Sequence, residues 1–393
     1  MDTVIDEMVE VETPSATRDQ GPRRRSWVWR LLSAMVWGLA SAAEWLLGAV
    51  SLTVGLAMLA AAPILQFLSL GYFLESAARV ARTGRLRDGL IGVRRSARLG
   101  SVAAGAWLSL TPAWLIASYA YSAEQINPSG RGPVLWRIGV IVVLVISLAH
   151  IACACARGGR PWHFFLPFGG PFWLRKRIRE GGLYRDSRDA LWSFTAALRL
   201  PYYFRLGLVG FVGTLVWIAP PALLIHAGGR FPPVGFLGAI LLAVVVPFLP
   251  FLQVRYAVEG RMAALFSRKA IRERYRRAPW AFAFSLMVLL IASIPLYLLK
   301  IEMIPREAAW LESLVFVIFL APARLLTGWA YARSGRREAP RHWILLVLGR
   351  LAIVPVALFY VLIVFLAQYT SWNGMASMID QHAFLLPVPF LSM

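Results

Sequence analysis

The sequence predicts an all-α fold: a polytopic transmembrane helix bundle of about nine spans, built as two parallel four-span repeats plus one further span. Hydrophobic residues make up 59% of the 393 residues and the mean hydropathy is positive, more than a soluble chain of this length could bury. Short clusters of arginine separate the apolar runs, and one pattern of residues occurs twice. These three observations exclude a soluble globular domain.

A transmembrane helix needs about 20 predominantly apolar residues. By this criterion the sequence predicts nine spans, at 31–50, 51–74, 100–122, 134–156, 206–226, 234–257, 279–300, 311–330 and 343–368. No polar turn separates the first two, so residues 31–74 could instead form an interfacial helix followed by one long span. In the second of the two repeats, a Gly- and Pro-rich loop divides 206–226 from 234–257. This favours two spans, joined as a hairpin, at 31–74 as well.

The chain before the first span is predicted to be a disordered acidic tail, residues 1–25, because it lacks an apolar run that could pack. Arg23, Arg24 and Arg25, followed by an apolar stretch, imitate a twin-arginine export signal. The apolar run continues to Leu74, however, which is too long for such a signal. A membrane hairpin is therefore favoured over cleavage.

The repeat consists of two matches in the same order. The pattern P-x-L-x-F-L-x-x-x-Y-x-x-E runs from Pro63 to Glu75 and again, 184 residues later, from Pro247 to Glu259. A second match pairs Ala154, Arg157, Gly159, Arg160, Pro161 and His163 with Ala330, Arg333, Gly335, Arg336, Pro340 and His342. The predicted organisation is a first repeat at 26–162, a linker at 163–204, a second repeat at 205–342, a final span at 343–368 and an extracytoplasmic tail at 369–393.

Arginine distribution predicts the orientation of the spans. Nearly all Lys and Arg residues fall in alternate segments, namely 18–30, 79–98, 157–205, 255–277 and 333–341. The positive-inside rule places these segments, and the N-terminus, in the cytoplasm. Four spans per copy make the repeats parallel, and such halves usually pack about a pseudo-twofold axis along the membrane normal. The net charge of +21 lies in these loops, so the expected partner is anionic lipid or an acidic protein rather than nucleic acid.

The linker is expected to stay at the membrane surface. Residues 163–174 are too few to span and too apolar for water, and Gly169, Gly170 and Pro171 could turn them back as a re-entrant or interfacial loop. Leu191, Phe194 and Leu198 recur at helical spacing, which predicts an amphipathic helix on the cytoplasmic lipid surface.

The repeated tyrosine and glutamate are the first candidates for a functional site: Tyr72, Glu75, Tyr256 and Glu259. Residues three apart share a helix face, and a carboxylate at the inner end of a span could relay protons or bind a cation. Alternatively, each Glu pairs with nearby arginines, Arg79 or Arg82 in the first copy and Arg255 or Arg261 in the second, and fixes the helix end at the headgroups. Pro63 and Pro247 are expected to break or kink their helices.

Two further arginines, Arg324 and Arg350, lie inside predicted spans and join the candidates, because a charge within a membrane is costly. Glu44 could neutralise one of them. Cys153 and Cys155 with His150 do not form a metal-binding pattern, since C-x-C on a helix directs the two sulfurs to different faces. His163 and His342 stand beside tryptophans at a predicted membrane boundary and are expected to anchor it.

The run from Gly71 through Arg79, Gly84 and Arg85 to Leu99 resembles the uncharacterised multi-pass bacterial membrane proteins grouped as domains of unknown function. The resemblance covers the layout of residues 30–370. It implies a bacterial inner-membrane location and brings no catalytic or binding residues.

The chain has no H-E-x-x-H, Walker, G-x-S-x-G or paired-aspartate motif, so no enzyme activity, catalytic residue, metal or cofactor is predicted. The expected function is a non-enzymatic scaffold or interaction protein of the cell envelope. The alternative is a transporter with its pathway at the interface of the two repeats.

Overall fold

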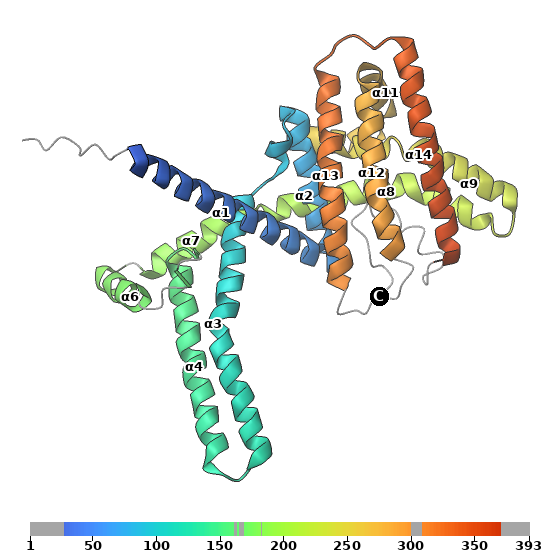
Figure 1. Ribbon diagram of the computed structural model, residues 1–393. Helices are drawn as coiled ribbons and strands as arrows, with labels where there is room; N and C mark the ends of the chain where they lie inside the picture. The colour runs from blue at the N-terminus through green and yellow to red at the C-terminus, as the bar shows by residue number, and fades with distance from the viewer. Residues whose placement is uncertain (1–26, 161–162, 165–168, 182, 300–308, 371–393) are drawn as a thin grey trace, which may run out of the picture. The chain divides into compact units, whose positions relative to one another are not determined.

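The computed structural model describes residues 27–160, 163–164, 169–181, 183–299 and 309–370, and every regular element in them is helical (Figure 1). Residues Trp45–Met393 form one compact unit, and Met1–Glu44, of which the first half of α1 is described, form another. The elements are α1 (Trp27–Ala61), α2 (Gln66–Thr83), η1 (Leu86–Gly89), α3 (Val93–Ile126), α4 (Arg131–Ala156), α6 (Gly169–Glu180), α7 (Leu183–Leu198), α8 (Leu200–Ala227), α9 (Pro232–Val245), α10 (Leu249–Glu259), η2 (Met262–Phe266), α11 (Arg268–Arg277), α12 (Pro279–Leu299), α13 (Ala309–Gly335) and α14 (Trp343–Thr370).

Seven helices in the described part of the chain are long and apolar enough to cross a membrane. They contain the stretches Ala34–Ala61, Val93–Ile126, Arg131–Ala156, Trp192–Ala227, Pro279–Leu296, Trp310–Gly335 and Trp343–Leu366. The pair α9 and α10, bent by 46° at a short break, adds an eighth if the two helices form one span. The all-helical class expected from the sequence is therefore confirmed, with several helices of the length and hydropathy expected of membrane spans.

The predicted boundary between the spans 31–50 and 51–74 is wrong, because α1 continues without interruption to Ala61. Ala49, Val50 and Ser51, where the two spans were expected to meet, contain neither proline nor glycine and simply extend the helix. The chain breaks at Pro63 instead. The next residue, Ile64, has a φ of 70°, a left-handed conformation that β-branched residues rarely adopt.

Both repeated prolines lie in breaks between helices, as expected: Pro63 between α1 and α2, and Pro247 between α9 and α10. Both following helices also end alike. Gly84 and Gly260 adopt left-handed conformations, with φ of 74° and 71°, and each donates its N–H to the carbonyl four residues earlier. A short 3-10 helix follows each glycine.

These landmarks do not share one offset between the two matching segments. The prolines are 184 residues apart, but the capping glycines are 176 apart, as are Ala154 and Ala330 in the second match. The segment from proline to glycine is therefore eight residues longer in the first copy, which is about two helical turns. Glu75 and Glu259 occupy equivalent positions when the two copies are aligned at their prolines. They do not when the copies are aligned at their capping glycines.

Glycine contacts place α2 tightly against its neighbours. A Cβ on Gly71 would overlap the backbone carbonyl of Tyr203 in α8, and a Cβ on Gly207 of α8 would overlap that of Phe67. On the side facing α13, a Cβ on Gly328 would overlap the carbonyl of Ala77. Small residues at such crossings let helix backbones approach closely. As a result, α2 is enclosed by α8, α10 and α13.

The two copies differ in their packing. In the second copy, α13 packs against α12, α2 and α10. In the first copy, α4 packs mainly against α3, with a smaller contact to α6. The side chains of the α3–α4 hairpin are largely exposed, including Trp107 and Trp114. Helices α4 and α13, which occupy matching positions in the two copies, therefore do not make the same contacts, and α2 and α10 are packed differently as a result.

The linker contains two helices, α6 and α7. Gly169, Gly170 and Pro171, which were expected to turn a re-entrant loop, instead belong to the first turn of α6. Part of that predicted loop, residues 165–168, lies outside the described residues. The helix expected around Leu191 to Leu198 is confirmed as the second half of α7.

Candidate functional site

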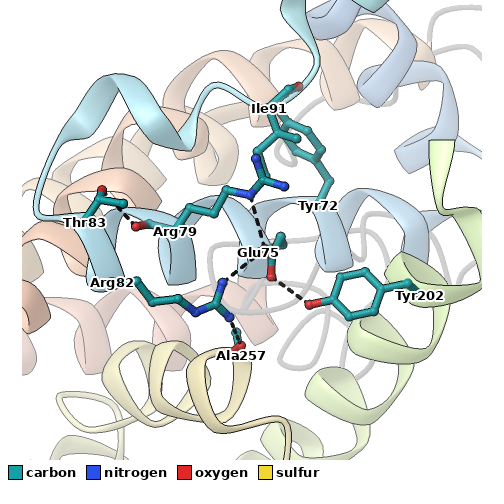
Figure 2. A network of polar contacts seen from close by, with 8 residues as sticks. All are labelled: Tyr72, Glu75, Arg79, Arg82, Thr83, Ile91, Tyr202 and Ala257. Carbon is teal, nitrogen blue, oxygen red and sulfur yellow. Dashed lines mark hydrogen bonds and ion pairs between the residues drawn. The ribbon is translucent and has the colours of Figure 1, made fainter. Parts of the chain in front are cut away.

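Tyr72 and Glu75 lie on α2 but make separate contacts (Figure 2). The Tyr72 hydroxyl donates a hydrogen bond to the carbonyl of Ile91, 3.1 Å away, just before α3. Glu75 is 5% exposed and faces α8 and α10. The tyrosine therefore holds the loop after α2, while the glutamate lies within a different set of polar groups.

The Glu75 carboxylate accepts three hydrogen bonds. Arg79 Nε and Arg82 Nη1 donate to Oε1 over 3.3 and 3.2 Å, and the Tyr202 hydroxyl of α8 donates to Oε2 over 2.8 Å. Arg82 also donates through Nη2 to the carbonyl of Ala257 in α10, 2.9 Å away (Figure 2). One carboxylate and its arginine partner thereby connect three helices.

The second copy pairs its glutamate with arginines too. Glu259 accepts a hydrogen bond of 2.6 Å from Arg255 Nε and one of 3.5 Å from Arg261 Nη2. This pairing with nearby arginines is the alternative expected from the sequence for both glutamates. Unlike Glu75, Glu259 is the last residue of its helix and its side chain is 24% exposed. Tyr256 is 4% exposed and packs among apolar residues, including Leu74 and Leu206.

Arg324 is the most deeply buried charged residue in the described part of the chain, at 2% exposure. Its guanidinium donates to the side-chain oxygen of Gln253 in α10, and Gln253 in turn donates to the Thr214 hydroxyl of α8 over 2.6 Å. Thr214 donates to the carbonyl of Gly210. A chain of polar groups therefore crosses from α13 to α8 inside an otherwise apolar core.

Arg350 is exposed on α14 and lies within electrostatic reach of Tyr275 in α11. Burial raises the pKa of Tyr275 to about 12, while the Arg350 charge opposes that shift. The Tyr275 hydroxyl donates to the carbonyl of Leu346, 3.3 Å away, and links α11 to α14. The two candidate arginines consequently occupy different environments, one buried and one exposed.

No group of three or more His, Cys, Asp or Glu residues that could hold a metal ion occurs in the described ranges. Cys153 and Cys155 are free thiols, and a ring nitrogen of His150 lies 3.0 Å from the carbonyl of Phe164. His342 is exposed and lies beside Trp343, with ring centroids 6.0 Å apart. Burial and the charges of Arg157 and Arg160 lower the pKa of His163.

Tyr202, Gln253 and Thr214 are the residues that sequence reasoning missed. Gln253 carries a signal, because it is a lone amide between Leu252 and Val254 in an apolar segment, where an unsatisfied polar group would be costly. Tyr202 carries none, since it lies 127 residues from the glutamate that it contacts.

Comparisons with known proteins give no further assignment: no protein-family model, no curated protein and no solved structure matches this chain.

Proposed function

We propose that the protein is a non-enzymatic scaffold or interaction protein of the bacterial inner membrane. The observation that carries this proposal is the set of contacts around Glu75. Its carboxylate accepts hydrogen bonds from two arginines of its own helix and from Tyr202 of α8. A carboxylate that relays protons or cations must exchange partners, whereas one held from several helices fixes their arrangement. The geometry favours a rigid brace at this position.

We infer that α2 is itself a crossing. The continuous helix α1 accounts for one crossing between the arginines at 18–30 and those at 79–98. Both arginine segments lie on the cytoplasmic side, as the positive-inside rule requires, only if α2 makes a second crossing. Its 18 residues have a length of about 27 Å, close to the about 30 Å of the hydrocarbon core. The polar side chains Ser69, Glu75 and Ser76 are buried against protein, which suits a central helix.

With α9 and α10 as one crossing, this arrangement has nine crossings in total. The N-terminus and the arginine-rich segments then face the cytoplasm, and the chain after Thr370 is extracytoplasmic. The cytoplasmic arginines would meet the anionic lipid of the inner leaflet or an acidic protein partner.

The second candidate function is transport, and the polar chain formed by Thr214, Gln253 and Arg324 supports it. Buried polar groups that connect several membrane helices often mark substrate or proton pathways. Transport through this chain requires water to reach it from at least one side of the membrane. A scaffold needs no such access.

Cysteine accessibility separates the two functions. In a Cys153→Ser, Cys155→Ser background, Ser69→Cys and Thr214→Cys introduce thiols of nearly serine or threonine size at positions with 0% exposure. Thr83→Cys, on the exposed end of α2, is the control. Each variant is treated with a membrane-impermeant thiol reagent, first from the cytoplasmic side and then from the outside.

The scaffold proposal expects labelling of Thr83→Cys from the cytoplasmic side only, and none of Ser69→Cys or Thr214→Cys. Labelling of either buried position would show a solvated path and would favour the transporter. Labelling of Thr83→Cys from the outside would contradict the proposed orientation.

A further inference from the structure

Four arginines from three parts of the chain converge on one pair of tyrosines. They are Arg79 and Arg82 of α2, Arg95 of α3, and Arg199 between α7 and α8, and we call them the arginine junction. Tyr202 is within electrostatic reach of Arg82 and Arg199. Tyr203 is within reach of Arg79, Arg95 and Arg199. The junction is therefore a three-dimensional feature and not one basic loop.

Each guanidinium in the junction is held by a specific contact. Arg79 and Arg82 hydrogen bond to Glu75, as described above. Arg95 donates through Nη1 to the carbonyl of Ala197, 2.9 Å away. Arg199 stacks over the ring of Tyr202, with its guanidinium carbon 4.7 Å from the ring centroid. Four cations are thereby oriented before any ligand arrives.

The backbone at Arg199 is strained. Its φ of 51° and ψ of 37° are left-handed, a conformation that is unfavourable for a residue other than glycine. Within the described residues only Ile64 shares a positive φ without being glycine. Glycine would adopt this conformation at little cost. An arginine here places its side chain over Tyr202, and strained residues of this kind concentrate at functional sites.

The charges of the junction are unbalanced. Glu75 supplies one carboxylate among the four guanidinium groups that define it. The side chains of Arg79 and Arg82 are 39% and 42% exposed, and Arg95 and Arg199 are exposed. A guanidinium offers five N–H donors, more than these contacts use. Accessible, oriented donors with a net positive charge match a phosphate group, which arginine binds in a bidentate manner.

We propose that the arginine junction is a binding site for a phosphate ester, with the headgroup of an anionic phospholipid or a soluble phosphorylated molecule as its source. The inference rests on the proposed orientation, in which these residues face the cytoplasmic headgroups. It also deepens the proposed function, because it replaces a general attraction between arginine loops and lipid by one defined site.

Binding of two phosphate ligands to the purified full-length chain tests the site. In non-ionic detergent, the chain is titrated with phosphatidylglycerol and, separately, with glycerol phosphate, and native mass spectrometry gives each dissociation constant. The test variant is Arg95→Gln with Arg199→Gln, which leaves the brace at Glu75 intact. The matched control, Arg272→Gln with Arg276→Gln, removes two exposed charges from α11.

We expect the test variant to weaken binding of phosphatidylglycerol about tenfold, and the control less than twofold. If glycerol phosphate binds and shows the same difference between variants, a soluble phosphate ester also fits the site; if only the lipid does, the source is the membrane. Equal weakening by both variants, or none by either, overturns the proposal.

A single substitution, Arg199→Gly, separates binding from folding. Glycine relieves the backbone strain, so the melting temperature should stay the same or rise while phosphate binding weakens. If binding of both ligands is unchanged in Arg199→Gly, the site is refuted. The scaffold proposal would not be affected, because the accessibility of Ser69→Cys and Thr214→Cys does not depend on any ligand.

Discussion

The helix α2 and the α3–α4 hairpin show opposite relations between composition and packing. Helices α3 and α4 pass every criterion of length and hydropathy for a membrane span, yet only 17% and 11% of their most apolar windows are buried within the protein. Helix α2 is not among the helices that pass, but its residues from Ser69 to Ala78 are almost all buried. Hydropathy therefore identifies the hairpin and misses a helix that is enclosed by its neighbours.

The difference follows from the surroundings of each helix. A helix that faces lipid must be apolar on its outer surface, because lipid cannot satisfy a polar group. A helix enclosed by other helices can carry Glu75 and Ser69, since protein groups satisfy them. It also needs glycine where neighbouring backbones cross, as at Gly71. Polar and glycine residues thus mark the centre of this bundle.

The largest effect is expected at the helix crossing. Gly71→Ala or Gly207→Ala would place a methyl group on a backbone carbonyl of the neighbouring helix, which cannot move aside as a side chain could. We expect each substitution to lower the free energy of unfolding by about 3 kcal/mol, the upper end for an overpacked core. Unfolding in mixed micelles, followed by circular dichroism, measures the change.

The control for this prediction is Gly55→Ala in α1, where a Cβ would meet nothing within 4 Å. It should change the free energy of unfolding by less than about 1 kcal/mol, in the stabilising direction, because alanine favours a helix over glycine. A similar loss at Gly55 and Gly71 would show that the crossing is not the cause.

A smaller effect is expected from the buried amide. Gln253→Leu removes both the acceptor for Arg324 and the donor to Thr214 in a core with no exposure. Leaving a buried polar group without its partner costs about 2 kcal/mol. Gln125→Leu, at the exposed end of α3, is the matched control and should leave stability unchanged. Equal melting temperatures for the two variants would refute a structural role for Gln253.

The next effect concerns the brace. Glu75→Gln retains the size of the side chain but removes the charge that Arg79 and Arg82 contact. Because both arginines are more than a third exposed, solvent screens their repulsion, and we expect a loss of about 1 kcal/mol. Glu124→Gln, which breaks an exposed pair with Arg137 on the hairpin, is the control and should have no measurable effect on the melting temperature.

Much of the architecture could be predicted from the sequence because it depends on local composition. The apolar runs identify seven helices, and Pro63 and Pro247 mark two breaks. The continuity of α1 through Val50 could not be predicted, because the apolar stretch there is long enough to be read either as one helix or as the ends of two. The two sequence matches already differ in offset, with 184 residues between the prolines and 176 between Ala154 and Ala330. The capping glycines, Gly84 and Gly260, show that the eight-residue difference arises between each proline and the end of the helix that follows it.

The candidate site was predictable only in part. The pairing of Glu75 and Glu259 with arginines follows from spacing along one helix, where residues four apart are neighbours. The contribution of Tyr202 does not, because it depends on how α8 crosses α2. Arg324 could be singled out by its cost within a membrane, but its partners on α8 and α10 could not. Long-range contacts carry no periodic signal in one sequence.

The smallest effect should come from the surface of the hairpin. Trp114 is 72% exposed on α3, so Trp114→Ala should change the free energy of unfolding by less than about 0.5 kcal/mol in detergent. Phe282→Ala, which removes a buried ring stacked on Phe251 at 4.1 Å, should cost about 3 kcal/mol in the same assay. If Trp114→Ala were as damaging, and its effect grew with protein concentration, this face of the hairpin would be buried against a second copy of the chain. The contrast with α2 would then reflect assembly and not contact with lipid.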